Sequence, residues 1–260
     1  MFEDVFANGS ITTIVGAMAA GKTEKLIETY REAKEKGLNV SVFKPLMDSR
    51  SQVDRVESRN GNTAPATAID SLMDIVYNED EENPYDIVLI DESQFFLDPK
   101  DLHVLEGMAI VGIDVYLFGL DMTSEKELFG QMGDVMGMSD DVIKLKAKCT
   151  ECGDEARYTF YKEGNKSNDI EVGDLDVYDS LCRVCYHTKQ GEKSVEVGDN
   201  VLCFQFKLND GEPYSELYID KEELEKSGYT PEDVRDINSI EGYNNLLVDL
   251  GVQQEDEENE

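Results

Sequence analysis

The sequence predicts an α/β protein with a doubly wound, mostly parallel sheet, followed by a small domain built around cysteines and a C-terminal α+β extension. Three observations support this fold class. A P-loop motif, Gly16-Ala-Met-Ala-Ala-Gly-Lys-Thr23, stands between a strand pattern and a helix pattern. Strand and helix patterns then alternate over residues 10–145, as they do in parallel sheets covered by helices. Two Cys-x-x-Cys pairs follow, starting at Cys149 and Cys182.

The composition indicates a globular chain that carries a strong negative charge. Its 260 residues include 57 acidic residues against 24 Lys and Arg, for a formal net charge of −33, and 40% are hydrophobic. That apolar fraction is sufficient for a packed core. The charge repels phosphates and so makes DNA, RNA and anionic membranes poor partners. The longest apolar stretches are strand-length, so we expect no transmembrane helix. A high-salt habitat is an alternative explanation of the acidity, although most of the basic residues are Lys.

The first strand and helix patterns place the P-loop motif. Residues 10–15 form a β-branched run that stops at Gly16, and the apolar stripe of a helix follows the motif. Glycines allow backbone N–H groups to turn toward phosphates, and the dipole of the helix N-terminus adds to the attraction. Lys22 can reach the β- and γ-phosphates, and the Thr23 hydroxyl can ligate Mg²⁺. The alternative is a glycine-rich turn with a solvent-exposed lysine. We predict that a nucleoside triphosphate binds to Gly16, Ala17, Met18, Ala19, Ala20, Gly21, Lys22 and Thr23.

A second strand pattern, residues 38–43, leads into Asp48 and Arg50. Polar residues just beyond the carboxyl end of a strand lie where ligands bind in open α/β sheets. On their own, these two residues would more often form an ion pair at the surface. The next segment, residues 58–65, is rich in turn-forming residues, and we expect an irregular loop there.

A third strand pattern, residues 86–90, ends in two carboxylates, Asp91 and Glu92. Beside a P-loop, this is the pattern of a Walker B strand, in which Asp91 would bind the Mg²⁺ ion or one of its water ligands. Adjacent residues at a strand end point in different directions, so Glu92 is available as a general base. Taken alone, an Asp-Glu pair at the end of a strand is more often a cap. Another buried strand pattern follows at residues 114–119.

Four of the five cysteines form the two pairs, which are Cys149 with Cys152 and Cys182 with Cys185. Paired thiolates at this spacing favour one tetrahedral Zn²⁺, and a shell closed by four cysteines indicates a structural site. Four unligated cysteines are the alternative. Without a secretory signal, the pairs also indicate a reducing, cytoplasmic setting. The remaining Cys203 fits a buried core thiol.

We expect four segments along the chain. Residues 1–145 form the P-loop core, residues 146–190 the zinc-binding domain, residues 191–254 an extension, and residues 255–260 a disordered acidic tail. The extension has two strand patterns around the turn signal Asn209-Asp-Gly211 and then three short helix patterns. Packing, an oligomer contact and partner binding all remain open as its role.

In this order, the motifs resemble those of the type II thymidine kinases. The resemblance is carried by the P-loop, by Asp91-Glu-Ser-Gln-Phe-Phe96, by Gly119-Leu-Asp121 and by Cys182-Arg-Val-Cys-Tyr186, and it runs from about Ile11 to Tyr186. It implies a P-loop (RecA-like) core and transfer of the γ-phosphoryl group of ATP to the 5′-hydroxyl of thymidine, with Glu92 as the catalytic base. The product would be dTMP, with deoxyuridine as a further substrate.

The resemblance also implies the ligands and their contacts. The ligands are ATP, thymidine, Mg²⁺ on Thr23 and Asp91, and a structural Zn²⁺ on the four paired cysteines. The resemblance assigns further ATP contacts to Asp48, Ser49, Arg50, Asp91 and Gln94. It assigns the thymidine pocket to Met18, Leu120 and Phe129, together with Ile170, Glu171, Val172, Gly173 and Tyr178 of a lasso loop between the cysteine pairs. A homotetramer and feedback inhibition by dTTP are implied as well.

Three departures from the family pattern concern the substrate pocket. Asp174 follows Gly173 where the family has two glycines, Ser124 stands in place of an aromatic residue, and Lys126 replaces an arginine. A nucleoside kinase with a different base preference is therefore one alternative. A second is a P-loop ATPase that acts on DNA, which the negative charge disfavours. A third is a catalytically silent nucleotide-binding regulator, which is disfavoured by the combined presence of Lys22, Thr23, Asp91 and Glu92.

Overall fold

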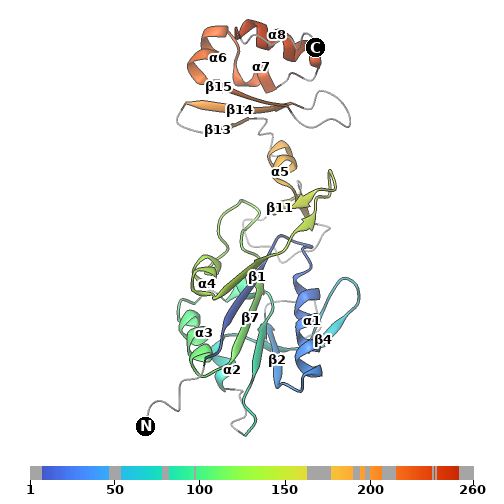
Figure 1. The fold of residues 1–260 in the computed structure, drawn as a ribbon, viewed down its shortest axis with the longest axis vertical. Coiled ribbons are helices and arrows are strands. Elements are labelled where there is room, and N and C mark those ends of the chain that lie inside the picture. The colour runs from blue at the N-terminus through green and yellow to red at the C-terminus, as the bar shows by residue number, and fades with distance from the viewer. Residues whose placement is uncertain are drawn as a thin grey trace, which may run out of the picture. The chain divides into compact units, whose positions relative to one another are not determined.

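A parallel sheet forms the centre of the first of two units into which the computed structural model divides (Figure 1). The units are Met1–Tyr186 and His187–Glu260. The first is built of alternating strands and helices and the second of an antiparallel sheet with helices, which confirms the predicted fold class. The structure describes residues 8–46, 54–77, 82–96, 98–162, 177–189, 194–196, 200–206, 215–235, 237 and 239–251.

Six strands form the central sheet in the order β5-β2-β6-β7-β1-β8, and every pair of neighbours is parallel. β1 leads into the P-loop and β6 leads into Asp91, with β7 between them. Because the strands are parallel, the carboxyl ends of all of them lie at one edge, which is where open α/β sheets bind ligands. The strands are β1 (Ile11–Val15), β2 (Val40–Pro45), β5 (Thr67–Ile69), β6 (Ile87–Ile90), β7 (Asp114–Gly119) and β8 (Asp141–Lys144).

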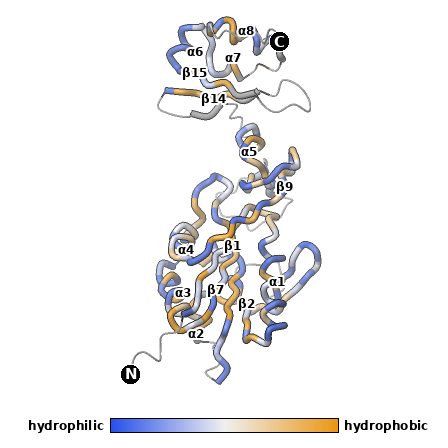
Figure 2. Tube along the Cα trace, viewed as in Figure 1, coloured by the Kyte–Doolittle hydropathy of each residue, from blue (hydrophilic) through white to orange (hydrophobic). Residues whose placement is uncertain are grey.

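Helices cover both faces of this sheet. Alternate residues of β6 belong to two separate cores, Val88 and Ile90 to the core with α3, and Ile87 and Leu89 to the core with α1. A strand that is buried on both faces needs an unbroken apolar run, which explains the Ile-Val-Leu-Ile sequence of β6. Figure 2 shows the hydrophobic residues gathered along the central strands. The helices are α1 (Lys22–Glu35), α2 (Met73–Tyr77), α3 (Lys100–Ile110) and α4 (Met132–Met138).

An antiparallel hairpin of β3 (Arg55–Glu57) and β4 (Thr63–Pro65) stands where the sequence predicts an irregular loop. Two backbone hydrogen bonds close its turn, from the Ser58 N–H to the Asn62 carbonyl at 2.8 Å and from the Gly61 N–H to the Ser58 carbonyl at 2.9 Å. Gly61 has a φ of 78°, which a glycine adopts without strain. The irregular-loop prediction was wrong because the turn residues form the tip of a hairpin, and the strands on either side are only three residues long.

The cysteine-rich part of the first unit consists of two short antiparallel strand pairs and the start of a helix. β9 pairs with β10, and β11 pairs with β12. Its core centres on the buried ring of Tyr186, whose centroid lies 5.1 Å from that of Tyr158 and 5.6 Å from that of Phe160. The Tyr186 hydroxyl donates a hydrogen bond to the Ser124 carbonyl and so joins this part to the loop after β7. The elements are β9 (Ala147–Lys148), β10 (Glu155–Ala156), β11 (Tyr158–Tyr161), β12 (Tyr178–Leu181) and α5 (Arg183–Lys189).

The second unit has its own antiparallel sheet and its own core. Leu202, Phe204 and Ile219 of the sheet pack against apolar residues of the helices, among them Leu224 and Leu246. The turn signal Asn209-Asp-Gly211 and the acidic tail 255–260 lie outside the described residues. In the described part of the chain, none of the helices has the length and apolar character needed to span a membrane. The elements are β13 (Ser194–Glu196), β14 (Val201–Phe206), β15 (Ser215–Asp220), α6 (Lys221–Ser227), α7 (Pro231–Arg235) and α8 (Ile240–Asp249).

Candidate functional site

A cavity of about 470 Å³ lies at the carboxyl ends of β1 and β6. The P-loop, the start of α1, the turn of the β3–β4 hairpin and the end of β6 contribute to its wall. The structure therefore brings together most of the P-loop residues and both carboxylates that the sequence predicts as site residues. The lining residues are Met18, Ala19, Ala20, Gly21, Lys22, Thr23, Glu24, Glu57, Ser58, Arg59, Asn60, Asp91 and Glu92.

The P-loop backbone turns around the ammonium group of its own lysine. Lys22 Nζ donates hydrogen bonds to the carbonyls of Gly16 and Ala17, at 2.9 and 3.0 Å. Two residues of the loop have left-handed backbones, Ala19 with a φ of 60° and Gly21 with a φ of 86°. A non-glycine residue pays a conformational cost in that region, and such strain concentrates at binding loops. The loop therefore places the Lys22 ammonium group beside its own main chain, and Lys22 also lines the cavity.

Asp91 and Glu92 lie at the point where β6 ends and the chain turns into the short helix η1 (Ser93–Phe95). The Glu92 N–H donates a hydrogen bond to Asp91 Oδ1 at 3.1 Å. Glu92 has a φ of 48°, so this residue too is in the left-handed region. The two adjacent carboxylates line one cavity because of this strained turn, and strain of this kind is typical of catalytic residues.

Gln94 lies behind the cavity wall and holds the side chain of Glu92. Its Nε2 donates a hydrogen bond to Glu92 Oε2 at 2.6 Å, and its Oε1 accepts one from the Leu120 N–H at 3.0 Å. The residue is only 1% exposed. Gln94 is not among the lining residues, and the nitrogen and oxygen of its side-chain amide instead connect Glu92 to Leu120, directly after β7. Sequence reasoning missed this connection.

The predicted pocket residues Leu120 and Phe129 belong to one small apolar cluster. The ring of Phe129 packs edge-on against that of Phe95 in η1, with centroids 5.7 Å apart. Tyr178 is half-buried at the start of β12, and its ring lies 5.4 Å from that of Tyr161. The other predicted contacts, Asp48, Ser49, Arg50, Ile170, Glu171, Val172 and Gly173, lie outside the described residues.

Two side chains of the cysteine-rich part hold the main chain of Met18 in the P-loop. Thr159 Oγ1 of β11 accepts a hydrogen bond from the Met18 N–H at 3.0 Å. The Ser180 hydroxyl of β12 donates one to the Met18 carbonyl. Both side chains are buried. No motif marked Thr159 or Ser180 in the sequence, since each is a single small polar residue within a short strand.

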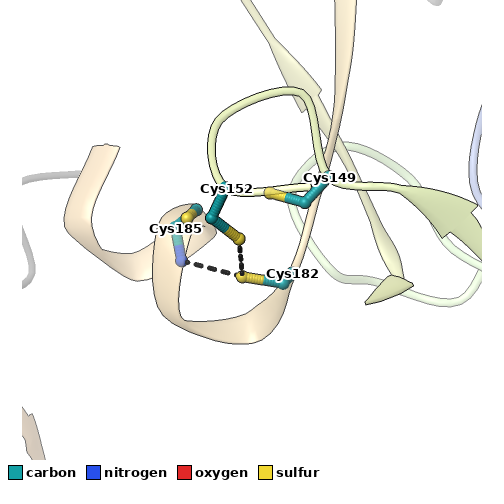
Figure 3. A group of neighbouring side chains, drawn as sticks. All are labelled: Cys149, Cys152, Cys182 and Cys185. Atoms are coloured by element: carbon teal, nitrogen blue, oxygen red, sulfur yellow. Dashed lines mark hydrogen bonds between the residues drawn. The ribbon is translucent and has the colours of Figure 1, made fainter. Parts of the chain in front are cut away.

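The four paired cysteines converge on one point, as Figure 3 shows. Their sulfur atoms all lie within 4.8 Å of one another. The sulfur atoms of Cys152 and Cys182 are 3.7 Å apart, and the Cys185 N–H donates a hydrogen bond to the Cys182 sulfur at 3.4 Å. Two ligands of a tetrahedral zinc with Zn–S bonds of about 2.3 Å stand at a similar separation. The cluster can therefore hold a zinc ion, as the spacing of the cysteines predicts.

The cysteine cluster does not release its protons evenly. Burial raises the pKa of Cys185, and the neighbouring thiols raise it further. Burial also acts to raise the pKa of Cys149, but backbone amides of Cys152, Cys182 and Glu151 donate hydrogen bonds to its sulfur and lower the pKa to about 6. These hydrogen bonds thus favour the thiolate of Cys149, which is the form of cysteine that binds a metal.

Comparisons with known proteins converge on one family. A family model described as thymidine kinase matches residues 9–186. A thymidine kinase of Porphyromonas gingivalis (strain W83) is 36% identical over 184 residues, which cover 70% of this chain and 87% of the relative. A thymidine kinase of Bacteroides thetaiotaomicron is 35% identical over 195 residues, 75% of this chain and 96% of the relative. One of Mycoplasma genitalium is 35% identical over 191 residues, with coverages of 73% and 88%.

Proposed function

We infer the function from one premise, which is that the chain belongs to the thymidine kinase family. It follows that the protein uses ATP to phosphorylate thymidine to dTMP. The observation that carries this conclusion is that the family match spans residues 9–186, which include the whole cavity and all four paired cysteines. The test is a coupled assay with thymidine, deoxyuridine, deoxycytidine, deoxyadenosine and deoxyguanosine at saturating Mg·ATP. Thymidine should be the preferred substrate, and no turnover of any nucleoside would refute the assignment.

The P-loop is our proposed triphosphate site. Its backbone amides and Lys22 would bind the β- and γ-phosphates, and the predicted contacts Asp48, Ser49 and Arg50 remain part of this proposal. Thr23 and Asp91 line the same cavity with oxygen donors suited to Mg²⁺. When bound, Mg²⁺ neutralises charge on the β- and γ-phosphates. This local positive field allows a chain of strongly negative net charge to bind a polyanion.

Glu92 is our proposed general base. The 5′-hydroxyl of a nucleoside is weakly acidic and must lose its proton as its oxygen bonds to the γ-phosphorus. The Glu92 carboxylate shares a cavity with Lys22 and Asp91, and Gln94 orients it through one oxygen. The other carboxylate oxygen can then accept the proton. Met18, Leu120, Phe129 and Tyr178, with the lasso residues 170–173, would form the thymidine pocket around this carboxylate.

A small change at Gly119 should disturb the general base Glu92 without altering the Glu92 side chain itself. A Cβ atom there would lie 2.6 Å from the Ser93 hydroxyl and 2.7 Å from Gln94 Oε1. We expect Gly119→Ala to displace Gln94, to lower the unfolding free energy by about 1–3 kcal/mol, and to lower turnover because Glu92 loses its support. Urea denaturation and steady-state kinetics measure the two effects.

Gly107→Ala is the matched control for this substitution. Gly107 lies within α3, and a Cβ atom added there has no neighbour within 4 Å. The change should leave turnover unaltered and slightly raise stability, because alanine favours the helix by roughly 1 kcal/mol over glycine. Native turnover in Gly119→Ala would contradict the positioning role of Gln94.

The second unit is not needed for the chemistry in this proposal. The family match and the cavity both lie within the first unit, which has its own core. We expect a chain that ends at Gln190 to keep its zinc and to turn over thymidine within about threefold of the full-length rate. Activity assays and metal analysis of both chains check this. A folded, zinc-loaded but inactive truncated chain would show that the extension contributes to the site.

We extend the proposal to the setting of the enzyme. The structural Zn²⁺ would be bound by Cys149, Cys152, Cys182 and Cys185, whose convergence supports it. A cytoplasmic homotetramer with dTTP as feedback inhibitor is what the family resemblance implies for this chain. Size-exclusion chromatography with light scattering would test the assembly, and inhibition assays with dTTP would test the regulation.

A further inference from the structure

The chain between β7 and α4 folds back on itself in a short hairpin, residues 121–129, which we name the pocket hairpin. Leu120 directly precedes the hairpin and Phe129 ends it, so both of its ends carry residues of the proposed thymidine pocket. The Phe129 N–H donates a hydrogen bond to the Asp121 carbonyl at 3.0 Å, which closes the base of the hairpin. The arrangement of the two pocket residues therefore depends on how this hairpin is held.

The tip of the pocket hairpin contacts Tyr186 through two different groups. The Tyr186 hydroxyl donates a hydrogen bond to the Ser124 carbonyl, and the ammonium group of Lys126 lies 5.1 Å from the centroid of the Tyr186 ring. A cation over an aromatic ring is attracted by the negative face of the ring. Lys126 has a left-handed backbone with a φ of 64°, and its N–H donates a hydrogen bond to the Thr123 carbonyl at 3.2 Å. The hydroxyl and the ring of one tyrosine thus fasten the same tight turn.

Tyr186 is itself firmly supported. Its side chain is fully buried, and the rings of Tyr158 and Phe160 pack against it with centroids 5.1 and 5.6 Å away. Its N–H donates a hydrogen bond to the Cys182 carbonyl at 3.0 Å, and Cys185 directly precedes it in the chain. Both cysteines belong to the cysteine cluster. The position of the tyrosine is therefore set by the cysteine cluster and the aromatic core around it.

The base of the pocket hairpin has an attachment of its own, which is partly exposed. Lys144 Nζ lies 2.9 Å from Asp121 Oδ2, with the lysine side chain 60% exposed. Ion pairs with an exposed partner contribute at most about 1 kcal/mol. A hydrogen bond from a buried hydroxyl contributes a similar amount. The hairpin therefore depends on Tyr186 at its tip about as much as on the ion pair at its base.

We propose that Tyr186 is a positioning residue for the nucleoside, which holds the tip of the pocket hairpin and so keeps Leu120 and Phe129 in the arrangement that binds thymidine. The proposal rests on the thymidine pocket of the proposed function. Tyr186 is not among the residues that line the cavity, so it acts through the hairpin. Because Tyr186 follows Cys185 directly, the zinc-binding part of the chain sets the affinity for the nucleoside by this route.

Tyr186→Phe tests the proposal in the full chain, because it removes the hydroxyl and keeps the packing of the ring. The KM for thymidine should rise about fivefold, which corresponds to about 1 kcal/mol, the usual contribution of one hydrogen bond. The turnover number and the calorimetric affinity for Mg·AMPPNP should stay native. A native KM for thymidine, or an equal loss of affinity for Mg·AMPPNP, would overturn the proposal.

Hydrogen exchange without any nucleoside tests the hold on the hairpin separately. Within the hairpin, the Thr123 N–H donates a hydrogen bond to the Glu127 carbonyl at 2.8 Å and the Phe129 N–H donates one to Asp121. Exchange of these amides should be faster in Tyr186→Phe, because the hairpin opens locally more often. Faster exchange with a native KM would show that Tyr186 only stabilises the hairpin and would refute the positioning role.

The two measurements also keep two failures apart. A wild-type enzyme that turns over no nucleoside would refute the proposed function. Native exchange rates in Tyr186→Phe would instead refute the hold of Tyr186 on the pocket hairpin, whatever the enzyme phosphorylates.

Tyr158→Phe is the matched control, since it removes a hydroxyl from the same aromatic core. The ring of Tyr158 lies 5.5 Å from the guanidinium carbon of Arg183, and both contacts of Tyr186 with the hairpin remain in this variant. The KM for thymidine and the exchange rates of the hairpin amides should stay native. A rise in KM equal to that in Tyr186→Phe would show that the effect is a general one of the aromatic core.

Lys126→Met provides a second route should Tyr186→Phe fold poorly, because Lys126 is only half-buried and lies on a loop. The change removes the charge above the Tyr186 ring and should raise the KM for thymidine about threefold, as expected for a cation–π contact of moderate exposure. Lys126→Arg keeps a cation there and should have a native KM. Native values in Lys126→Met, or an equal rise in both variants, would contradict the contact with Tyr186.

Discussion

We expect Glu92→Gln to lower the turnover of thymidine by about 10²-fold or more while the affinity for Mg·ATP stays nearly native. The amide has the shape of the carboxylate but cannot take up the proton of the 5′-hydroxyl. Its carbonyl oxygen can still accept the hydrogen bond that Gln94 Nε2 donates to Glu92 at 2.6 Å, so the side chain keeps its position. Steady-state kinetics at saturating substrates give the turnover number, and calorimetry with Mg·AMPPNP gives the affinity.

Glu57→Gln separates the loss of a base from the loss of a charge. Glu57 is an exposed carboxylate that lines the same cavity and has no proposed chemical role. Its removal should change turnover by no more than about threefold, as is usual for an exposed side chain. If Glu92→Gln turns over thymidine at a near-native rate, or if both variants lose activity equally, Glu92 is not the general base.

The second large effect is expected at the cysteine cluster. Cys182→Ser should abolish zinc binding and lower the unfolding free energy by at least roughly 3 kcal/mol, because a structural zinc site contributes its binding energy to folding. Cys182 lies between β12, which carries Ser180, and α5, which carries Tyr186. The hydrogen bonds of those two residues to Met18 and Ser124 should weaken with the cluster. The affinity for Mg·ATP should therefore fall as well.

Cys203→Ser is the control for this experiment. Cys203 lies on β14 in the second unit and is not part of the cysteine cluster. Metal analysis by mass spectrometry should find the native zinc content in Cys203→Ser and none in Cys182→Ser. Denaturation curves of both variants give the stability. An unchanged zinc content in Cys182→Ser would show that Cys182 is not a ligand that the zinc site requires.

The parts of the site that were predictable from the sequence are those that a few consecutive residues encode. The P-loop, the apolar strand that ends at Asp91 and the cysteine pairs each have a spacing that follows from local geometry. The parallel sheet and the convergence of the cysteines confirm the fold that these motifs predict. Asp48–Arg50 and Ile170–Gly173 lie outside the described residues, and their roles stay predictions.

The contacts that complete the site were not predictable, because they join distant parts of the chain. The bonds of Thr159 and Ser180 to Met18 span 141 and 162 residues. Propensity and periodicity report only on near neighbours. Gln94 illustrates the same limit, since its amide reaches Leu120 across 26 residues. The left-handed backbone of Glu92 is also invisible in an Asp-Glu pair, which gives no hint of the sharp turn.

The hydrogen bonds at Met18 have a consequence for how new substrate preferences can arise. Both bonds engage the main chain, which every residue except proline supplies in the same form. The Met18 side chain meanwhile lines the cavity and is unbranched and adaptable. In the proposed function Met18 belongs to the thymidine pocket, so its main chain would hold the P-loop while its side chain contacts the nucleoside. Exchanges at position 18 would then change the shape of that pocket and keep both main-chain hydrogen bonds.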